Sequence, residues 1–242
     1  MKVRLDRLLV ERGFFESGEK ARRAVMAGTV TVDGRRADKA GKAVDAGCAL
    51  AVAAPAPFVG RGGEKLDAAL KTFRVPVSGR HCLDLGASTG GFTDCLLKAG
   101  ATSVIAVDVG RGQLDRRLRE DPRVVVRERT NARYLSREDL PRDAELVTVD
   151  LSFISLDKVL PAISRLIVGG GDLVALVKPQ FEAGRSEVQR GGVVRNGRVH
   201  ARVVWHACLA AERCGLEIMG IAESPLTGPA GNREFFIHAR KP

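Results

Sequence analysis

The sequence predicts an α/β protein in which a small α+β domain precedes a doubly wound, mostly parallel sheet of seven strands. Three observations lead to this prediction: a break in composition near residue 55, alternating apolar runs and helical segments after it, and two basic helices with a hairpin before it. Near-continuous apolar runs separated by helices are typical of parallel strands covered on both faces. Two final strand-like runs, 216–222 and 234–239, add an antiparallel strand to this sheet.

The parallel strands are predicted from short apolar runs in the second part of the chain. These runs are 82–83, 104–107, 124–126, 146–149 and 173–177. Before the last two strands, a helix is expected over 200–214, because apolar residues recur there at helical spacing and Gly215 follows.

A linker is predicted at residues 55–63. Two prolines and three glycines within this stretch interrupt any regular element. The linker divides an N-terminal domain, residues 1–54, from a C-terminal domain, residues 64–242.

The N-terminal part is basic and compactly organised. A helix that ends before Gly13 is followed by Ser17, which is expected to cap a second helix. The run 30–32 followed by Asp33 and Gly34 predicts a strand that enters a tight hairpin turn. Twelve Lys and Arg against seven Asp and Glu through residue 63 give a net charge of +5, half of the +10 of the whole chain. A face of this sign favours phosphate binding, and its candidate RNA-binding residues are Arg4, Arg7, Arg12, Lys20, Arg22 and Arg23.

Composition limits the remaining possibilities. The chain has 242 residues, of which 45% are hydrophobic, and no apolar stretch long enough to span a membrane. Its five cysteines are widely spaced and form no Cys-x-x-Cys pair, which argues against disulfides and a zinc site. We therefore expect a cytoplasmic protein with no bound metal, no membrane partner and no evident obligate protein partner.

A small-residue turn at 83–92 is the first candidate binding site. It follows a strand and opens a helix, and Gly86 and Gly90 let backbone amides approach a ligand at the carboxyl end of the strand. The glycines lack the Gly-x-Gly-x-x-Gly order that a dinucleotide requires. Asp84 before the turn would suit an ammonium or sulfonium group, and Asp108 after the next strand would accept two ribose hydroxyls. S-adenosylmethionine fits both acids, whereas NAD does not.

Known families share these motifs. Residues 4–13, Ser17, 24–25 and 28–34 resemble the S4 RNA-binding domain. Residues 84–93, 128–133, 150–156 and 177–182 resemble the RrmJ/FtsJ-like class of S-adenosylmethionine-dependent RNA methyltransferases, which have a Rossmann-like sheet. As a whole the chain resembles the TlyA (hemolysin A) family of ribosomal RNA 2′-O-methyltransferases.

The resemblance implies a function and a set of site residues. It implies S-adenosylmethionine as cofactor and ribosomal RNA, or a ribosomal subunit, as partner. The matched cofactor-binding residues are Asp84, Gly86, Ser88, Gly90, Phe92, Asp108 and Asn131, the last of them near the adenine. The family's catalytic Lys-Asp-Lys-Glu tetrad falls on Lys65, Asp150, Lys178 and Glu234, four residues that also lie at predicted helix or strand ends.

The tetrad suits the methylation of a ribose 2′-hydroxyl. Such a hydroxyl is a poor nucleophile until a base takes its proton, and an amine can do this only in its neutral form. We expect Lys178 to be the general base and Asp150 to orient it. Lys65 would hold the hydroxyl or ribose and favour neutral Lys178, and Glu234 would fix Lys65 or a substrate hydroxyl.

Other functions fit the sequence less well. A nicotinamide dehydrogenase lacks its glycine pattern, and a pseudouridine synthase lacks its Gly-Arg-Leu-Asp segment. An S4-type RNA-binding protein without catalysis and a membrane-active haemolysin stay as alternatives. By family analogy the target is a cytidine, and the end of the chain soon after its last strand favours large-subunit over small-subunit RNA.

Overall fold

The computed structural model describes residues 1–53 and 56–242, which form two compact units, Met1–Ala56 and Pro57–Pro242. The expected domain boundary at residue 54 and the start of the expected linker at Pro55 lie outside the described residues. The other end of that linker was placed wrongly, because helix α3 already begins at Arg61. Glycines occur in its first turn because space is short there: a Cβ on Gly63 would lie 2.3 Å from the Phe58 side chain, and one on Gly62 would lie 3.3 Å from the Phe92 ring.

The N-terminal unit packs two helices against short strands. Its elements are β1 (Lys2–Arg4), α1 (Leu5–Glu11), α2 (Gly18–Met26), β2 (Val30–Val32), β3 (Arg35–Arg36), β4 (Ala43–Asp45) and β5 (Leu50–Val52). Ser17 caps α2, as predicted, by accepting a hydrogen bond from the Lys20 amide. The predicted hairpin is also confirmed: β2 pairs with β3 around Asp33 and Gly34, both at positive φ.

The C-terminal unit is the predicted seven-stranded sheet. Its strands are β6 (His81–Leu85), β7 (Ser103–Val107), β8 (Val124–Arg127), β9 (Ala144–Val149), β10 (Ile167–Val177), β11 (Glu217–Glu223) and β12 (Phe235–Arg240), in the order β11-β12-β10-β9-β6-β7-β8. Strands β8, β7, β6, β9 and β10 pair in parallel, and β12 runs antiparallel to β10 and β11. The chain reverses its direction of travel across the sheet between β6 and β9, where ligands bind in folds of this kind.

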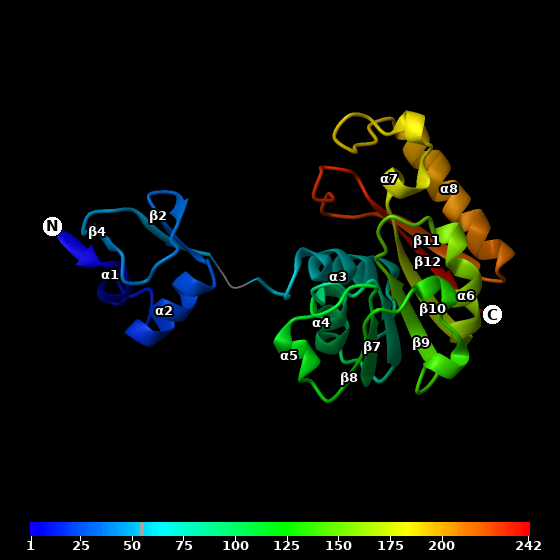
Figure 1. Ribbon diagram of the computed structural model, residues 1–242, viewed down its shortest axis with the longest axis horizontal. Helices are drawn as coiled ribbons and strands as arrows, with labels where there is room; N and C mark the ends of the chain where they lie inside the picture. Colours follow the sequence, from blue (N-terminus) through cyan, green and yellow to red (C-terminus); the bar gives the residue numbers. More distant parts are fainter. Residues whose placement is uncertain (54–55) are drawn as a thin grey trace. The chain divides into compact units, whose positions relative to one another are not determined.

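Helices cover both faces of this sheet (Figure 1). They are α3 (Arg61–Phe73), α4 (Gly91–Lys98), α5 (Arg116–Arg119), α6 (Leu160–Leu166), α7 (Pro179–Glu182) and α8 (Gly197–Arg213), with short 3-10 turns η1 (Ala132–Tyr134), η2 (Arg137–Asp139), η3 (Leu156–Lys158) and η4 (Arg185–Glu187). One apolar core lies between the sheet and α3 and α4, and a second lies between the sheet and α6 and α8. The expected helix at 200–214 is confirmed as α8.

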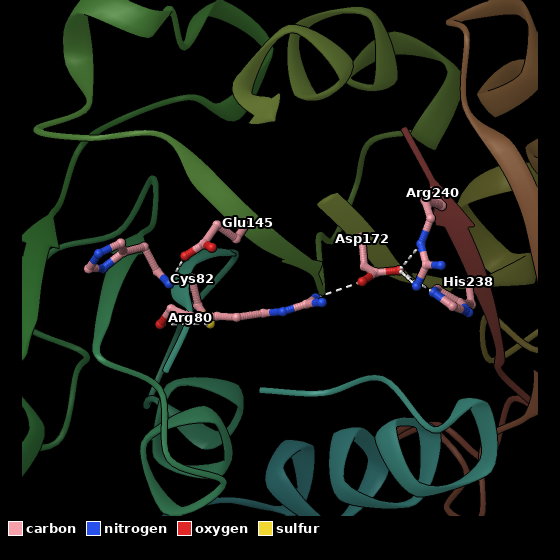
Figure 2. Close-up of polar contacts among 7 residues, drawn as sticks. Arg80, Cys82, Glu145, Asp172, His238 and Arg240 are labelled. Carbon is pink, nitrogen blue, oxygen red and sulfur yellow. Dashed lines mark hydrogen bonds and ion pairs between the residues drawn. The ribbon is translucent and has the colours of Figure 1, made fainter. Parts of the chain in front are cut away.

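A buried ionic cluster joins β10 and β12 (Figure 2). Strand β10 ends just before Lys178, and β12 begins just after Glu234. Asp172 of β10 is fully buried and accepts hydrogen bonds from His238 at 2.8 Å, Arg80 at 2.6 Å, and Arg240 at 3.0 and 3.1 Å. Burial alone would raise the pKa of Asp172, but the hydrogen bonds from these three partners outweigh it and lower that pKa to about 2. Asp172 is therefore a carboxylate held by Arg80, which precedes β6, and by His238 and Arg240 of β12.

Candidate active site

The turn after β6 forms the floor of one cavity. Gly86 has φ +88°, and a Cβ there would lie 2.3 Å from the carbonyl oxygen of Asp150, so only glycine fits between the two strand ends. Gly90 caps α4 at φ +99°, where a Cβ would meet the Leu118 side chain at 2.2 Å. The two glycines thus shape the turn by close packing.

The cofactor cavity, as we call it, opens above this turn and has a volume of about 450 Å³. Four residues expected to bind cofactor line it: Gly86, Ser88, Asp108 and Asn131. Its apolar lining includes Val109 and Ile154. A cavity of this size, mostly apolar with a few fixed polar groups, fits a nucleoside.

Backbone amides hold Asp108 in place. Its two carboxylate oxygens accept hydrogen bonds from the Ser88 amide at 2.8 Å and the Gly110 amide at 2.6 Å. Each carboxylate oxygen can accept a second bond, so both remain able to receive ribose hydroxyls. Asn131 uses its side-chain oxygen to accept from the Arg133 amide at 3.0 Å, which leaves its NH₂ group as a donor.

Asp84 does not lie in the cavity, and its expected contact with the cofactor's cationic group is wrong for this structure. Its side chain is fully buried and accepts hydrogen bonds from Thr93 at 2.7 Å and Thr148 at 3.2 Å. Burial raises the pKa of Asp84 to about 7, although both threonine hydrogen bonds favour its charged form. Asp84 therefore ties β6 to α4 and β9 beneath the turn.

Two further expected cofactor residues also support the turn from below. Phe92 is 3% exposed and packs against Phe236 with ring centroids 6.2 Å apart. Gly90 faces Leu114 and Leu118. The sequence motif that predicts both residues does not distinguish a residue that contacts the ligand from one that holds the turn.

A second cavity, which we call the catalytic cavity, has a volume of about 460 Å³ and is lined by all four tetrad residues: Lys65, Asp150, Lys178 and Glu234. Strand register explains how these distant residues meet. Val177 pairs with Phe235, which places Lys178 beside Glu234, and the Asp150 amide donates to the Leu85 carbonyl at 2.9 Å. Asp150 lines both cavities, as do Ser152 and Phe153, so the two cavities share a wall.

The tetrad is arranged as two ion pairs. Lys65 Nζ lies 2.5 Å from Glu234 Oε2, and both side chains are at most 8% exposed. Lys178 Nζ lies 2.6 Å from Asp150 Oδ1 and donates a hydrogen bond to Ser152 Oγ at 3.0 Å. These contacts match the expected partners, Asp150 for Lys178 and Glu234 for Lys65. Lys178, 12% exposed, is thus paired with a residue of the wall that the two cavities share, and Lys65 is buried in the other ion pair.

Phe153 is a candidate site residue to which the sequence analysis gave no role. It lines both cavities, is 90% exposed, has φ +64°, and its ring lies 5.0 Å from that of Phe181. The loop that carries Phe153 is held by Glu182, which accepts hydrogen bonds from the Leu156 amide at 2.9 Å and from the Ser155 hydroxyl. The motif 150–156 contained the signal, but a sequence cannot show that an aromatic residue is exposed.

Most of the basic residues expected to bind RNA have partners within the N-terminal unit. Arg4 bonds Asp6, and Lys20 and Arg23 form i,i+4 pairs with Glu16 and Glu19. Arg22 lies 4.0 Å from Asp6, and Arg7 is exposed. Arg12 donates to the Cys48 and Ala46 carbonyls. Arg12 therefore links the end of α1 to the segment that holds Ala46 and Cys48. The exposed ion pairs of the other residues are weak, so their basic side chains can exchange a carboxylate for a phosphate.

Two features are absent from the described residues. None of the helices there has both the length and the apolar character needed to cross a bilayer. Within the same part of the chain, no three His, Cys, Asp or Glu side chains gather in a way that could hold a metal ion.

Comparison with known proteins identifies the two parts of the chain. Residues 58–241 match the FtsJ-like methyltransferase family, and residues 3–47 match the S4 domain. The 16S/23S rRNA (cytidine-2′-O)-methyltransferase TlyA of Mycobacterium tuberculosis is 47% identical over 99% of this chain and 90% of its own. The chain belongs to the TlyA family of FtsJ-like methyltransferases.

Two further relatives match almost the whole of this chain. YqxC of Bacillus subtilis is 49% identical over the whole chain and 86% of its own length. A solved hemolysin structure from Streptococcus thermophilus has 43% identity and a TM-score of 0.77, covering 99% of this chain and 88% of that one. The protein is therefore an S-adenosylmethionine-dependent methyltransferase with an S4 domain, as the sequence predicted.

The position of Asp108 leads to a prediction about cofactor affinity. Asp108→Ala should weaken S-adenosylmethionine binding about 10- to 100-fold, because it removes charged hydrogen bonds worth ~1.5–3 kcal/mol. Isothermal titration of the two proteins measures this change. Asp38→Ala, an exposed site in the N-terminal unit, is the control. Wild-type affinity in Asp108→Ala would remove Asp108 from the cofactor site.

Proposed function

We propose that this protein methylates the ribose 2′-hydroxyl of a cytidine in ribosomal RNA, with large-subunit RNA as its preferred substrate and the cytoplasm as its location. The observation that carries the proposal is the presence of two lysines and two carboxylates in one cavity that shares a wall with the cofactor cavity. A cytidine of ribosomal RNA as substrate is supported by the name of the M. tuberculosis relative and by the S4 domain. The preference for large-subunit RNA is supported by the name of a 32% identical relative from Campylobacter jejuni, a 23S rRNA (cytidine-2′-O)-methyltransferase.

The cofactor cavity fits the methyl donor. Gly86 leaves room for close approach to the backbone, Asp108 would hold the ribose hydroxyls, and Asn131 would lie near the adenine. When bound there, S-adenosylmethionine supplies a methyl group activated on a sulfonium. Asp150, Ser152 and Phe153 line both cavities and would border the transferred group.

The tetrad would supply positioning and proton transfer. Lys178, in its neutral form, accepts the proton of the 2′-hydroxyl as the oxygen attacks, while Asp150 and Ser152 orient its amine. Lys65, held by Glu234, donates a hydrogen bond to the hydroxyl or an adjacent ribose oxygen. Holding the reacting oxygen in line is expected to supply much of the rate.

Phe153 offers a flat apolar surface for the target base at the entrance of the catalytic cavity. Its ring is exposed and supported by Phe181. Unpaired bases stack on such aromatic side chains in RNA complexes. This position would favour a nucleotide turned out of its helix, whose ribose then reaches Lys178.

The proposal is tested by incubating the protein with labelled S-adenosylmethionine and purified large or small ribosomal subunits from cells that lack its gene. We expect label in the RNA fraction, with large subunits accepting more than small ones. Heat-inactivated protein is the control. Binding of RNA without any transfer would instead support the non-catalytic S4-type alternative.

A further inference from the structure

A basic loop between α7 and α8 forms part of the rim of the catalytic cavity. We call residues 183–196 the rim loop; in Figure 1 it lies near the loop that precedes β12. Gly192 of the rim loop and Asn232 of the other loop both line the cavity. The rim loop is thus placed where an RNA chain would pass on its way to Lys178.

The rim loop has a defined conformation. Gln189 and Val193 form an antiparallel bridge around Gly191 and Gly192, which have φ +89° and +76°. Val194 is 1% exposed, and its carbonyl lies 2.8 Å from His200 Nε2. The tip of the loop is therefore a tight turn, and Val194, which follows it, is buried.

Asn232 connects this turn to the tetrad. Asn232 is only 2% exposed. Its side chain donates a hydrogen bond to the Gly192 carbonyl at 2.8 Å and accepts one from the Val194 amide at 2.9 Å. Glu234, the partner of Lys65, follows two residues later. A single side chain therefore fixes the rim loop relative to the strand end that carries Glu234.

The charges of the rim loop remain available to a ligand. Arg185, Arg190 and Arg195 are exposed, and none of them makes an ion pair with the described part of the chain. The one acid of the loop, Glu187, is paired with Arg202 of α8 and also accepts from the Gly184 amide. Guanidinium groups are well suited to bind phosphate oxygens in two-point contacts.

We propose that the rim loop is a phosphate clamp for the RNA strand around the target nucleotide, and that Asn232 is the positioning residue that sets it against the tetrad. The inference rests on the proposed function and adds a binding surface to it. Arg185, Arg190 and Arg195 hold backbone phosphates, so they contribute affinity without reading sequence.

The clamp is tested with the triple variant Arg185→Gln, Arg190→Gln, Arg195→Gln. We measure its affinity for deproteinised ribosomal RNA and for ribosomal subunits at several salt concentrations. A plot of log affinity against log salt has a negative slope, and the magnitude of this slope should be smaller than in wild type by about 2–3, since each phosphate contact contributes ~0.9. In the transfer assay KM for RNA should rise while kcat and cofactor affinity stay close to wild type.

The control is a triple Gln variant at Arg74, Arg165 and Arg213, which are exposed in the same unit. It should keep the wild-type slope. Asn232→Asp keeps the acceptor for Val194 and loses the donor to Gly192, so it should reproduce the lower slope and also lower kcat.

The outcomes separate this inference from the proposed function. A wild-type slope in the rim-loop triple variant would overturn the clamp even if methylation is normal. Affinity lost for subunits but kept for deproteinised RNA would assign the arginines to a protein partner and also overturn it. An inactive wild-type enzyme with a lowered slope in the triple variant would contradict the proposed function and leave the clamp supported.

Discussion

Lys178→Ala is expected to lower the rate of methyl transfer by ~10²–10⁴-fold, the usual contribution of a general base. Lys178 lines the catalytic cavity and not the cofactor cavity, so the Kd for S-adenosylmethionine should stay close to wild type. Single-turnover transfer to ribosomal RNA, with cofactor affinity measured in parallel, checks both parts.

Two variants make this result specific. Lys71→Ala removes an exposed lysine of α3 that pairs with Asp67, and it should leave both quantities unchanged. Lys178→Arg keeps the positive charge but cannot lose its proton at neutral pH, so it should be as inactive as the alanine variant. An active Lys178→Arg enzyme would show that only charge is needed at this position.

Asp172→Asn is expected to destabilise the protein by on the order of 3 kcal/mol, because it leaves three partners without their carboxylate (Figure 2). The value lies at the low end for buried pairs, since Arg80 and Arg240 are partly exposed and can turn toward water. A shift of that size lowers Tm by roughly 6–12 °C in a unit of this length. Asp67→Asn, which breaks an exposed pair, should change Tm little. Equal Tm shifts in the two variants would contradict the role given to Asp172.

The same cluster predicts a pH dependence of stability. The pKa of Asp172 is about 2 in the folded protein, below the ~3.9 of an aspartate in an unfolded chain. Its stabilisation, about 2–3 kcal/mol, is therefore complete above pH ~4 and is lost as the pH falls toward 2. Unfolding of wild type and Asp172→Asn in urea at pH 6 and at pH 2.5 should show their difference shrinking at the lower pH. A constant difference would contradict this account.

The fold could be predicted because its signals are local and periodic. Apolar runs such as 146–149 and 173–177 became β9 and β10, and Ser17 and Gly34 marked a cap and a turn. The start of α3 could not be read from the sequence. Glycines at 60, 62 and 63 indicate a break locally, whereas in the structure Gly60 and Gly62 let the start of α3 approach α4, and Gly63 makes room for the Phe58 side chain.

The candidate site could be predicted for residues that follow strand ends. It could not be predicted where the burial of a side chain decides its role. Lys178 and Asp150 meet because β9 and β10 are neighbours in a parallel sheet. Asp84 occupies an equally suggestive position, yet its side chain points inward to Thr93 and Thr148. The alternation of faces within a strand determines this difference, and a short motif does not reveal which face is buried.

The most direct test of the central claim is the identity of the methylated nucleoside. Ribosomal RNA modified by the wild-type protein is digested to nucleosides and analysed by mass spectrometry, with Lys178→Ala protein in parallel. The proposed chemistry predicts 2′-O-methylcytidine from wild type and none from Lys178→Ala. A methyl group on the base, or the same yield of 2′-O-methylcytidine from both proteins, would contradict it.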